Sequence, residues 1–318
     1  MIPKEHKYTF LTPTYNRERT LGRLYESLKR QTYKDFLWLV VDDGSVDQTR
    51  QLIEDYQKEG VIDIEYHYKK NGGKHTTLLY ASKLIRTDYV VIIDDDDEVT
   101  EDCLAVYDNT WKRISDEGKN DIGAIRALSV DKSGRVSGNY QPPIDSSYID
   151  SNYIQMEWVR GKHLENITCW KSETFRIPRL FDDSGKWLYD KVKAVYESVF
   201  WNRIARQYNT RYIYTPLRVY HTDSMDGLTN SKFNEQKCFN YVFTIYVMLN
   251  ELKKDAKKNT FLLLKEIGEY WSCGIALRLP LSKLFRVLDS SYVRLWSVFL
   301  IPFAAIVSIK LRRDFDNI

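Results

Sequence analysis

The sequence predicts an α/β protein: a mostly parallel sheet with helices on both faces, followed by a helical C-terminal extension. Three observations support this fold class. Strand and helix patterns alternate from residue 8 to residue 125. Residues 89–93 form a short β-branched run, as in the strands of sheets buried on both faces. Beyond residue 233 only the helical spacing of apolar residues remains.

Each element of the first half has its own signal. The predicted strands are residues 8–12, 36–41, 64–68 and 89–93. Apolar residues at i, i+3, i+4 and i+7 predict a helix after each strand. These helix stripes include Leu24, Ile53, Leu78 and Trp111. A β-α-β order of this kind implies parallel strands joined by right-handed crossovers.

Composition bounds the class of protein. A chain of 318 residues predicts about two domains, or one large domain with an appendage. A net charge of +3 does not argue for a nucleic-acid partner. Four cysteines without a C-x-x-C pair argue against a zinc site or disulfide scaffold and fit a reducing cytoplasm. Residues 1–7 lack the apolar stretch of a signal peptide.

Polar segments follow all four predicted strands, at residues 12–17, 42–45, 71–74 and 94–98. Taken singly, segments such as Asp43-Gly44 are ordinary turn formers. Parallel sheets, however, bind ligands beyond the carboxyl ends of their strands. The four segments together therefore predict a nucleotide-diphosphate site at one edge of the sheet.

The fourth segment contains the consecutive aspartates 94–97. Two carboxylates ~6 Å apart repel by roughly 3 kcal/mol at an effective dielectric of ~20. On an extended backbone, Asp94 and Asp96 would point to one side and Asp95 and Asp97 to the other. This arrangement suits Mg²⁺ or Mn²⁺, which prefer oxygen ligands and leave positions for phosphate. A solvated acidic turn is the alternative for an isolated run of this kind.

The strand-end motifs closely resemble those of the family 2 glycosyltransferases, inverting enzymes of the GT-A nucleotide-sugar fold. The matching segments are TPTYNRERTL (12–21), LKRQTYKDFLWLVVDDGSVDQT (28–49), KKNGGKHTTL (69–78) and YVVIIDDDDEV (89–99). They cover the first half in the expected order and spacing. The resemblance implies a metal-dependent transferase that moves a sugar from a nucleotide-sugar donor to an acceptor hydroxyl.

The resemblance also implies roles for individual residues. Asp43 would accept the ring N–H of the base, which favours a UDP-sugar donor without excluding guanine. Asp95 would reach the ribose. The remaining donor-binding residues would be Pro13 and Tyr15 at the base, Arg17, and Lys74 or the Gly73 amide at the diphosphate. The metal ligands would be Asp96 and Asp94, with His221 as a third ligand or a diphosphate donor; a structural role for His221 is the alternative.

The predicted catalytic base lies in the second half of the chain. Glu197 begins a helical register, where the helix N-terminus stabilises a carboxylate anion, and a lone glutamate there is commonly only a helix-start residue. The segment resembles the family's acidic residue followed by W-x-R-I, which implies that Glu197 is the catalytic base, with Asp190 and Asp183 as weaker candidates. Residues 131–134 predict a hairpin tip. Residues 158–170, bracketed by two tryptophans, predict either an acceptor wall or a surface loop with packed aromatics.

We expect three regions: residues 1–125 as the nucleotide-sugar-binding half, 126–232 as the acceptor-binding and catalytic half, and 233–318 as a helical region. In the last region, the apolar run 295–309 contains a proline and is too short for a straight membrane span. Between residues 278 and 313 there are seven basic residues and one acid. Residues 295–313 therefore predict a segment on an anionic membrane surface, with a core helix or a dimer contact as alternatives.

The expected enzyme thus acts in the cytoplasm, at the inner face of the membrane, on a cell-surface glycan or lipid-linked acceptor. Two other functions stay open at this point. A non-catalytic nucleotide-sugar sensor or membrane scaffold would bind the donor without consuming it. A sugar-phosphate nucleotidyltransferase would require a glycine-rich loop after the first strand, and residues 12–17 contain no glycine.

Overall fold

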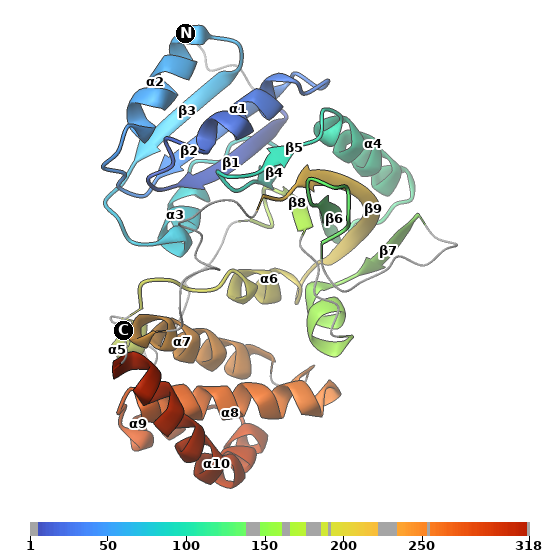
Figure 1. Cartoon of the computed structure of the whole chain (residues 1–318). Helices are drawn as coiled ribbons and strands as arrows, with labels where there is room; N and C mark the ends of the chain where they lie inside the picture. Colours follow the sequence, from blue (N-terminus) through green and yellow to red (C-terminus); the bar gives the residue numbers. More distant parts are fainter. Residues whose placement is uncertain are drawn as a thin grey trace. The chain divides into compact units, whose positions relative to one another are not determined.

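The computed structural model describes residues 6–137, 147–160, 166–175, 186–189, 192–221, 234–252 and 255–316. The chain divides into two compact units, drawn in Figure 1. Unit 1 comprises Met1–Met156, Lys162–Ile177 and Ile204–Gly227. Unit 2 comprises Glu157–Gly161, Pro178–Arg203 and Leu228–Ile318.

Unit 1 is built on a nine-stranded sheet in the order β3-β2-β1-β4-β8-β6-β9-β5, with β7 also paired to β9. The four strands of the first half pair in parallel, as predicted. Strand β8 runs antiparallel to β4 and β6, whereas β6 and β9 are parallel. Strands β5 and β7 lie antiparallel to β9. The strands are β1 (Tyr8–Thr14), β2 (Phe36–Asp42), β3 (Asp63–Tyr68), β4 (Tyr89–Ile92), β5 (Glu98–Val99), β6 (Ile122–Val130), β7 (Tyr148–Ser151), β8 (Asn166–Lys171) and β9 (Asn209–Val219).

Four helices follow the predicted stripes: α1 (Leu21–Lys29), α2 (Thr49–Glu59), α3 (Lys74–Ala81) and α4 (Cys103–Asp116). Buried residues of α1, α2 and α4 share one core cluster with Phe10 of β1 and Trp38 of β2. Helix α3 packs against β1 and β2, and its buried Leu78 and Ala81 lie outside that cluster. Since side chains alternate along a strand, α3 covers the other face. The predicted α/β fold with helices on both faces is confirmed.

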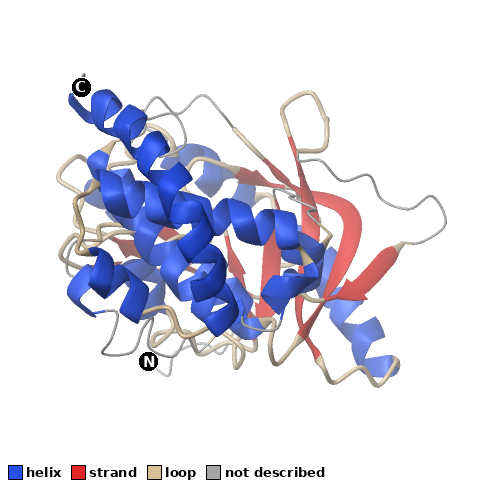
Figure 2. Ribbon diagram, turned by 90° about the horizontal axis from the view of Figure 1, so that it is seen from below, coloured by secondary structure: helices blue, strands red, loops and turns tan. Residues whose placement is uncertain are grey.

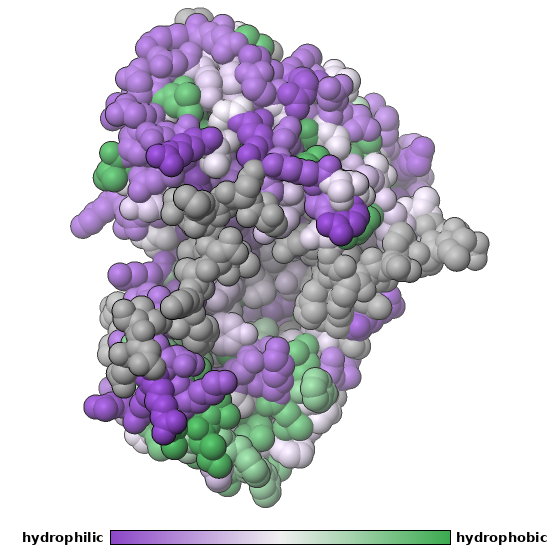
Figure 3. Space-filling view, in the orientation of Figure 1, coloured by the Kyte–Doolittle hydropathy of each residue, from purple (hydrophilic) through white to green (hydrophobic). Residues whose placement is uncertain are grey.

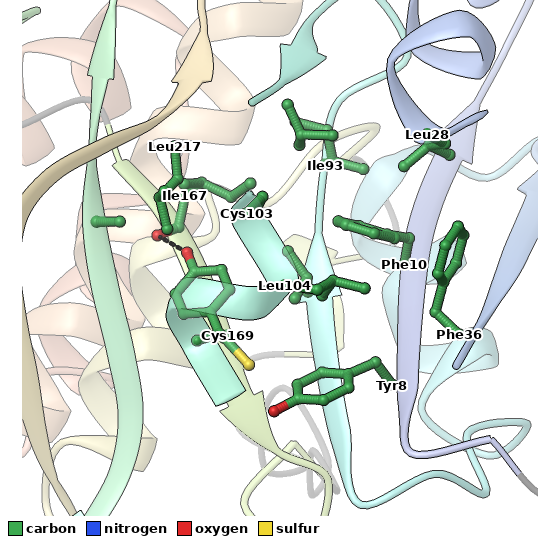
Figure 4. Close-up of a cluster of buried hydrophobic side chains, with 14 of the residues drawn as sticks. Tyr8, Phe10, Leu28, Phe36, Ile93, Cys103, Leu104, Ile167, Cys169 and Leu217 are labelled. Atoms are coloured by element: carbon green, nitrogen blue, oxygen red, sulfur yellow. Dashed lines mark hydrogen bonds between the residues drawn. The ribbon is translucent and has the colours of Figure 1, made fainter. Parts of the chain in front are cut away.

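The core cluster extends across the sheet, from Leu28 and Phe36 to Ile167 and Leu217 (Figure 4). Tyr107 satisfies its buried hydroxyl by donating to the carbonyl of Ile167 at 2.9 Å. All four cysteines are free and buried, in agreement with the prediction that they form no disulfide scaffold.

The predicted hairpin tip at residues 131–134 is present. The Gly134 amide donates to the carbonyl of Asp131, and the Asp131 amide donates to the carbonyl of Arg135, both at 2.9 Å. Gly134 adopts a φ of 80°, which few other residues tolerate.

Within the described residues, unit 2 contains helices and no strand (Figure 2). Helix α8 packs against both α7 and α10. The elements are a π-helical turn that enters the unit (Ile154–Val159), α5 (Lys186–Tyr189), α6 (Ser198–Ile204), α7 (Glu235–Leu252), a 3₁₀ turn (Asp255–Lys258), α8 (Thr260–Ala276), α9 (Leu281–Arg286) and α10 (Ser291–Asp316).

Helix α10 corrects one expectation. The sequence predicts an apolar run too short to span a membrane, but the helix continues through Pro302 and is 26 residues long. The flanking residues 291–294 and 310–316 extend it, although a proline inside a helix removes one backbone hydrogen bond. By length and composition, α10 is the one helix of the described chain that is long and apolar enough to cross a membrane.

Candidate active site

The loops after β1 and β2 are joined by hydrogen bonds. Asn16, at a φ of 54°, donates its amide to Ser45 Oγ at 2.8 Å and accepts from the Val46 amide at 2.9 Å. The Arg17 amide donates to Thr49 Oγ1 at 2.7 Å. Pro13 is buried in β1, whereas the Tyr15 side chain is 45% exposed beside this junction. The structure therefore brings the first two predicted segments together.

Asp43 connects the loop after β2 to the loop after β3. Its buried carboxylate accepts hydrogen bonds from the Gly72 amide at 2.9 Å and the Gly73 amide at 2.7 Å. It also forms an ion pair with Lys69. Lys69 further donates to Thr76 Oγ1 at 2.9 Å, so it holds the loop onto the start of α3. Sequence reasoning missed Lys69; its position beside the Asn-Gly-Gly turn was the available signal.

The aspartate run is not extended. Residues 95 and 96 form a turn, in which the Asp97 amide approaches the Asp94 carbonyl at 3.4 Å. The predicted alternation of the four side chains is therefore wrong. Because the chain turns, the Asp94 and Asp97 carboxylates both reach Arg218 of β9, Asp97 at 2.6 Å and Asp94 at 3.4 Å.

Cations of the chain itself neutralise part of this acidic turn. Lys74 donates to Asp94 Oδ1 at 2.5 Å, and Arg17 Nε donates to Asp95 Oδ1 at 3.0 Å. These contacts join Arg17, Lys74, Asp94 and Asp95, which the sequence had assigned to one site. The third cation, Arg218, was not predicted, because it lies 121 residues from its partner Asp97.

The pKa values of Asp94 and Asp95 are shifted in opposite directions. Burial raises the pKa of Asp94, but the charges of Lys74 and Arg218 outweigh it and bring that pKa to about 2. Burial raises the pKa of Asp95 to about 6, with Arg17 acting in the opposite direction. Asp94 is therefore an anion at neutral pH.

Asp96 is the carboxylate best placed to take an external cation. Among the described residues, its side chain has no hydrogen bond or ion pair, whereas its carbonyl accepts from Arg23 at 2.9 Å. The described residues contain no group of three or more His, Cys, Asp or Glu side chains arranged to hold a metal. One or two carboxylates completed by substrate phosphates and water fit Mg²⁺ or Mn²⁺ binding. The assignment of Asp96 and Asp94 as the ligands of such an ion stays a prediction.

His221 contacts the neighbouring acids rather than open space. Its Nε2 lies 2.9 Å from Glu98 Oε1, and its amide donates to Asp97 Oδ1 at 3.0 Å. Its side chain is buried, and burial lowers its pKa, so the ring is neutral at pH 7. These contacts suit the structural role that the sequence left as an alternative, and the metal-ligand role of His221 stays a prediction.

Glu197 belongs to unit 2, immediately before α6. Its carbonyl accepts from the amides of Phe200 and Trp201, the first hydrogen bonds of that helix. Helix α7 fixes the segment on both sides of Glu197. Asn240 Oδ1 accepts from the amides of Lys193 and Ala194, and Arg203 pairs with Glu251 at 2.5 Å.

The weaker base candidates Asp183 and Asp190 lie outside the described residues, as do residues 161–165 of the segment 158–170. The two tryptophans that bracket residues 158–170 are both buried. Trp170 is part of β8, within the sheet. Both tryptophan side chains therefore pack against other parts of the protein, and the acceptor role of the segment between them stays a prediction.

A mixed α/β sheet with its acidic turn and its loop amides at one strand edge defines the class of GT-A nucleotide-sugar transferases. The chain belongs to glycosyl transferase family 2, whose model matches residues 9–172, just over half of the sequence. It is therefore a glycosyltransferase. Membership of this family favours the transferase over the two alternative functions, the nucleotide-sugar sensor and the sugar-phosphate nucleotidyltransferase.

Two curated relatives illustrate the similarity. The GalNAc(5)-diNAcBac-PP-undecaprenol beta-1,3-glucosyltransferase of Campylobacter jejuni is 24% identical over 264 residues, which cover 79% of this chain and 78% of the relative. The poly(ribitol-phosphate) beta-N-acetylglucosaminyltransferase TarS of Staphylococcus aureus is 28% identical over 130 residues, 40% of this chain and 22% of the relative.

Two solved structures share the fold. TarS 1–349 of S. aureus in complex with UDP-GlcNAc aligns with a TM-score of 0.64 and 15% identity, over 96% of this chain and 92% of that chain. A mannosyltransferase of Pyrobaculum calidifontis, PcManGT in complex with GDP-Man and Mn²⁺, aligns with a TM-score of 0.51 and 16% identity, over 98% of this chain and 88% of that chain.

Proposed function

We propose that this glycosyltransferase is a metal-dependent, inverting enzyme that moves a sugar from a UDP-sugar to a hydroxyl of a glycan or lipid-linked acceptor. The observation that carries the proposal is the meeting of Asp43, Lys74 and the acidic turn 94–97 at the carboxyl edge of β1, β2 and β4. This edge is where parallel sheets bind nucleotides. The reaction itself is inferred from family membership and from the resemblance of the strand-end motifs to family 2 glycosyltransferases.

The donor would lie along the loops of unit 1. The half-exposed Tyr15 ring would stack on the base beside Pro13, and Asp43 would accept the imide N–H of uracil. In the structure, Asp43 holds the Gly72 and Gly73 amides, so base recognition has to use its remaining lone pairs. Asp95, oriented by Arg17, would accept from the ribose hydroxyls.

The diphosphate would be met by Lys74. The Gly73 amide donates to Asp43, which leaves the half-buried Lys74 ammonium as the stronger donor to phosphate oxygens. Asp96 and Asp94 would hold Mg²⁺ or Mn²⁺, an expectation supported by the Mn²⁺ named for the Pyrobaculum calidifontis mannosyltransferase. When bound, the ion supplies Lewis-acid stabilisation to the departing nucleoside diphosphate. We assign His221 to the support of this turn through Glu98 and Asp97, with metal ligation as the weaker role.

Glu197 would act as general base. Its carboxylate would take the proton of the acceptor hydroxyl as the oxygen attacks the anomeric carbon. The new C–O bond forms on the face opposite the breaking bond to the diphosphate, so one displacement inverts the anomeric configuration. No covalent sugar–enzyme intermediate is needed.

The names of two relatives support the proposed acceptor class. One of them is named for an undecaprenol-linked acceptor and the other for poly(ribitol phosphate). We infer an acceptor of the same broad kind, a growing glycan that is lipid-linked or destined for the cell surface. The enzyme would then act in the cytoplasm, at the inner face of the membrane.

The test is nucleoside-diphosphate release with UDP-GlcNAc, UDP-Glc and GDP-Man in the presence of a lipid-linked glycan acceptor, in Mn²⁺, in Mg²⁺ and in EDTA. We expect a UDP-sugar to be turned over only with a divalent ion. Glu197→Gln should bind the donor normally and lose about 10²–10⁴-fold in kcat, the usual contribution of a general base. Asp96→Ala should lose its response to Mn²⁺. The exposed Glu173→Gln is the matched control. Normal turnover in a folded Glu197→Gln or Asp96→Ala enzyme would remove that residue from its role.

A further inference from the structure

Helix α10 has two faces of different character. Its inner face contains Val293, Ser297, Ala304 and Ser308, all buried and spaced by four or seven residues. Its outer face is apolar and exposed, with side-chain exposures from 49% to 68%. The outer face comprises Leu295, Val298, Phe299, Phe303, Ile306, Val307 and Ile309.

Hydrogen bonds near both ends join α10 to other residues of unit 2. Near its C-terminus, Arg312 donates to the carbonyls of Ala276 at 3.1 Å and Ile275 at 2.6 Å, the last residues of α8. Near its N-terminus, Arg294 donates to the carbonyl of Leu288 at 2.5 Å. Between these points, α10 packs along α8. A helix that crossed a bilayer on its own would have to give up the Arg312 hydrogen bonds and the packing along α8.

A large exposed apolar strip needs a partner, because monomeric soluble proteins rarely leave one uncovered. Figure 3 shows hydrophobic side chains gathered over the end of unit 2 formed by α8, α9 and α10. Exposed basic residues flank the outer face: Lys283 and Arg286 on α9, and Lys310 and Arg313 at the end of α10. The two exposed acids of these flanks, Asp289 and Asp314, leave them with a net positive charge, which favours an anionic partner.

We propose that the outer face of α10 lies in the plane of an anionic membrane surface, with its aromatic and aliphatic side chains in the acyl boundary and the flanking lysines and arginines at the lipid headgroups. Apolar residues with basic flanks bind such surfaces by area burial and by attraction to anionic lipids together. The helix lies on the membrane and does not cross it, because its inner face stays on α8. The choice of a membrane as partner rests on the proposed function, in which the acceptor is lipid-linked.

The experiment is co-sedimentation of the full chain with phosphatidylcholine vesicles and with vesicles containing 30% phosphatidylglycerol. No donor or acceptor is present, so a failure here leaves the proposed transfer reaction untouched. We expect binding to the anionic vesicles. Phe299→Glu/Phe303→Glu should lower the bound fraction at least tenfold, and Val61→Glu, an exposed apolar residue of unit 1, should not change it. Lys310→Glu/Arg313→Glu should weaken binding to the anionic vesicles only.

Three results would overturn the proposal. The first is no vesicle binding by the wild type. The second is a dimer in light scattering that Phe299→Glu/Phe303→Glu converts to a monomer, without vesicle binding by either form, since a second copy would then cover the face. The third is retention of the chain in membranes after alkaline carbonate extraction, which identifies a spanning helix.

Discussion

The Nζ atom of Lys74 lies 2.5 Å from Oδ1 of Asp94, so a cation of the chain already pairs with one of the carboxylates proposed to hold the metal. Lys74 begins α3, and Asp94 follows β4 by two residues. Both groups are about one-third exposed. The negative diphosphate of a donor would compete with Asp94 for Lys74, and release of Asp94 would free it for the divalent ion.

Replacement of Lys74 by Met should therefore weaken donor binding more than chemistry. A charge-assisted hydrogen bond is worth about 1.5–3 kcal/mol, so we expect KM for the donor to rise about 10- to 100-fold. Steady-state kinetics at saturating Mn²⁺ measure this change. The exposed neighbour Lys70→Met is the control. An unchanged KM in the Lys74 variant would mean that Lys74 only balances Asp94.

Arg218 should be important for stability. Its side chain is 8% exposed and pairs with Asp97, whose side chain is fully buried. Removal of one partner of a buried pair costs about 3–5 kcal/mol, because the other charge stays buried and unpaired. We expect Arg218→Met to lose that amount of unfolding free energy in urea. Arg50→Met, which breaks the exposed i,i+4 pair with Glu54, should lose less than about 0.5 kcal/mol. Similar losses of unfolding free energy in both variants would contradict the importance of Arg218 for stability.

Acid should destabilise unit 1 through Asp150. Burial raises the pKa of Asp150, but its hydrogen bonds from Arg211 and Lys119 prevail and lower that pKa below its usual value. A depressed folded pKa adds stability that is present above the unfolded value of about 4 and is lost as the pH falls through the folded value. We expect the unfolding free energy of the wild type to fall between pH 5 and pH 3 by on the order of 1 kcal/mol more than that of Asp150→Asn. Urea unfolding at both pH values measures it. The exposed Asp116→Asn variant should lose as much unfolding free energy between the two pH values as the wild type. An equal loss in Asp150→Asn would refute the prediction.

Alanine substitutions at two glycines should separate the cost of backbone strain from the cost of a steric clash between loops. Gly44 and Gly118 both have positive φ, 87° and 67°, so alanine at either costs roughly 1–2 kcal/mol of strain. At Gly44 an added Cβ would also stand 2.8 Å from the Asn71 amide nitrogen, whereas at Gly118 it would meet nothing within 4 Å. Gly44→Ala should therefore lose at least about 1 kcal/mol more stability, and it should weaken donor binding. Thermal unfolding and donor titration test this, and equal effects of the two variants would show that the loops do not need to touch.

The sequence by itself determined the parallel half of the sheet and the edge at which the site lies. Buried strands followed by helix stripes leave little freedom in topology, and parallel strands bring their carboxyl ends to one edge. The segments that contain Arg17, Asp43, Lys74 and the aspartates therefore converge as predicted. The resemblance of the same segments to family 2 glycosyltransferases was sufficient for the family.

Only the tertiary structure decided how the charges are paired. Lys69 on Asp43, Arg218 on Asp97 and Glu98 against His221 are contacts between residues 26, 121 and 123 positions apart. Local spacing carries no information about such partners, because they depend on which strands become neighbours in the sheet. The same holds for α10. Its sequence shows that it is apolar, but its packing on α8 decides which face is buried and which stays exposed.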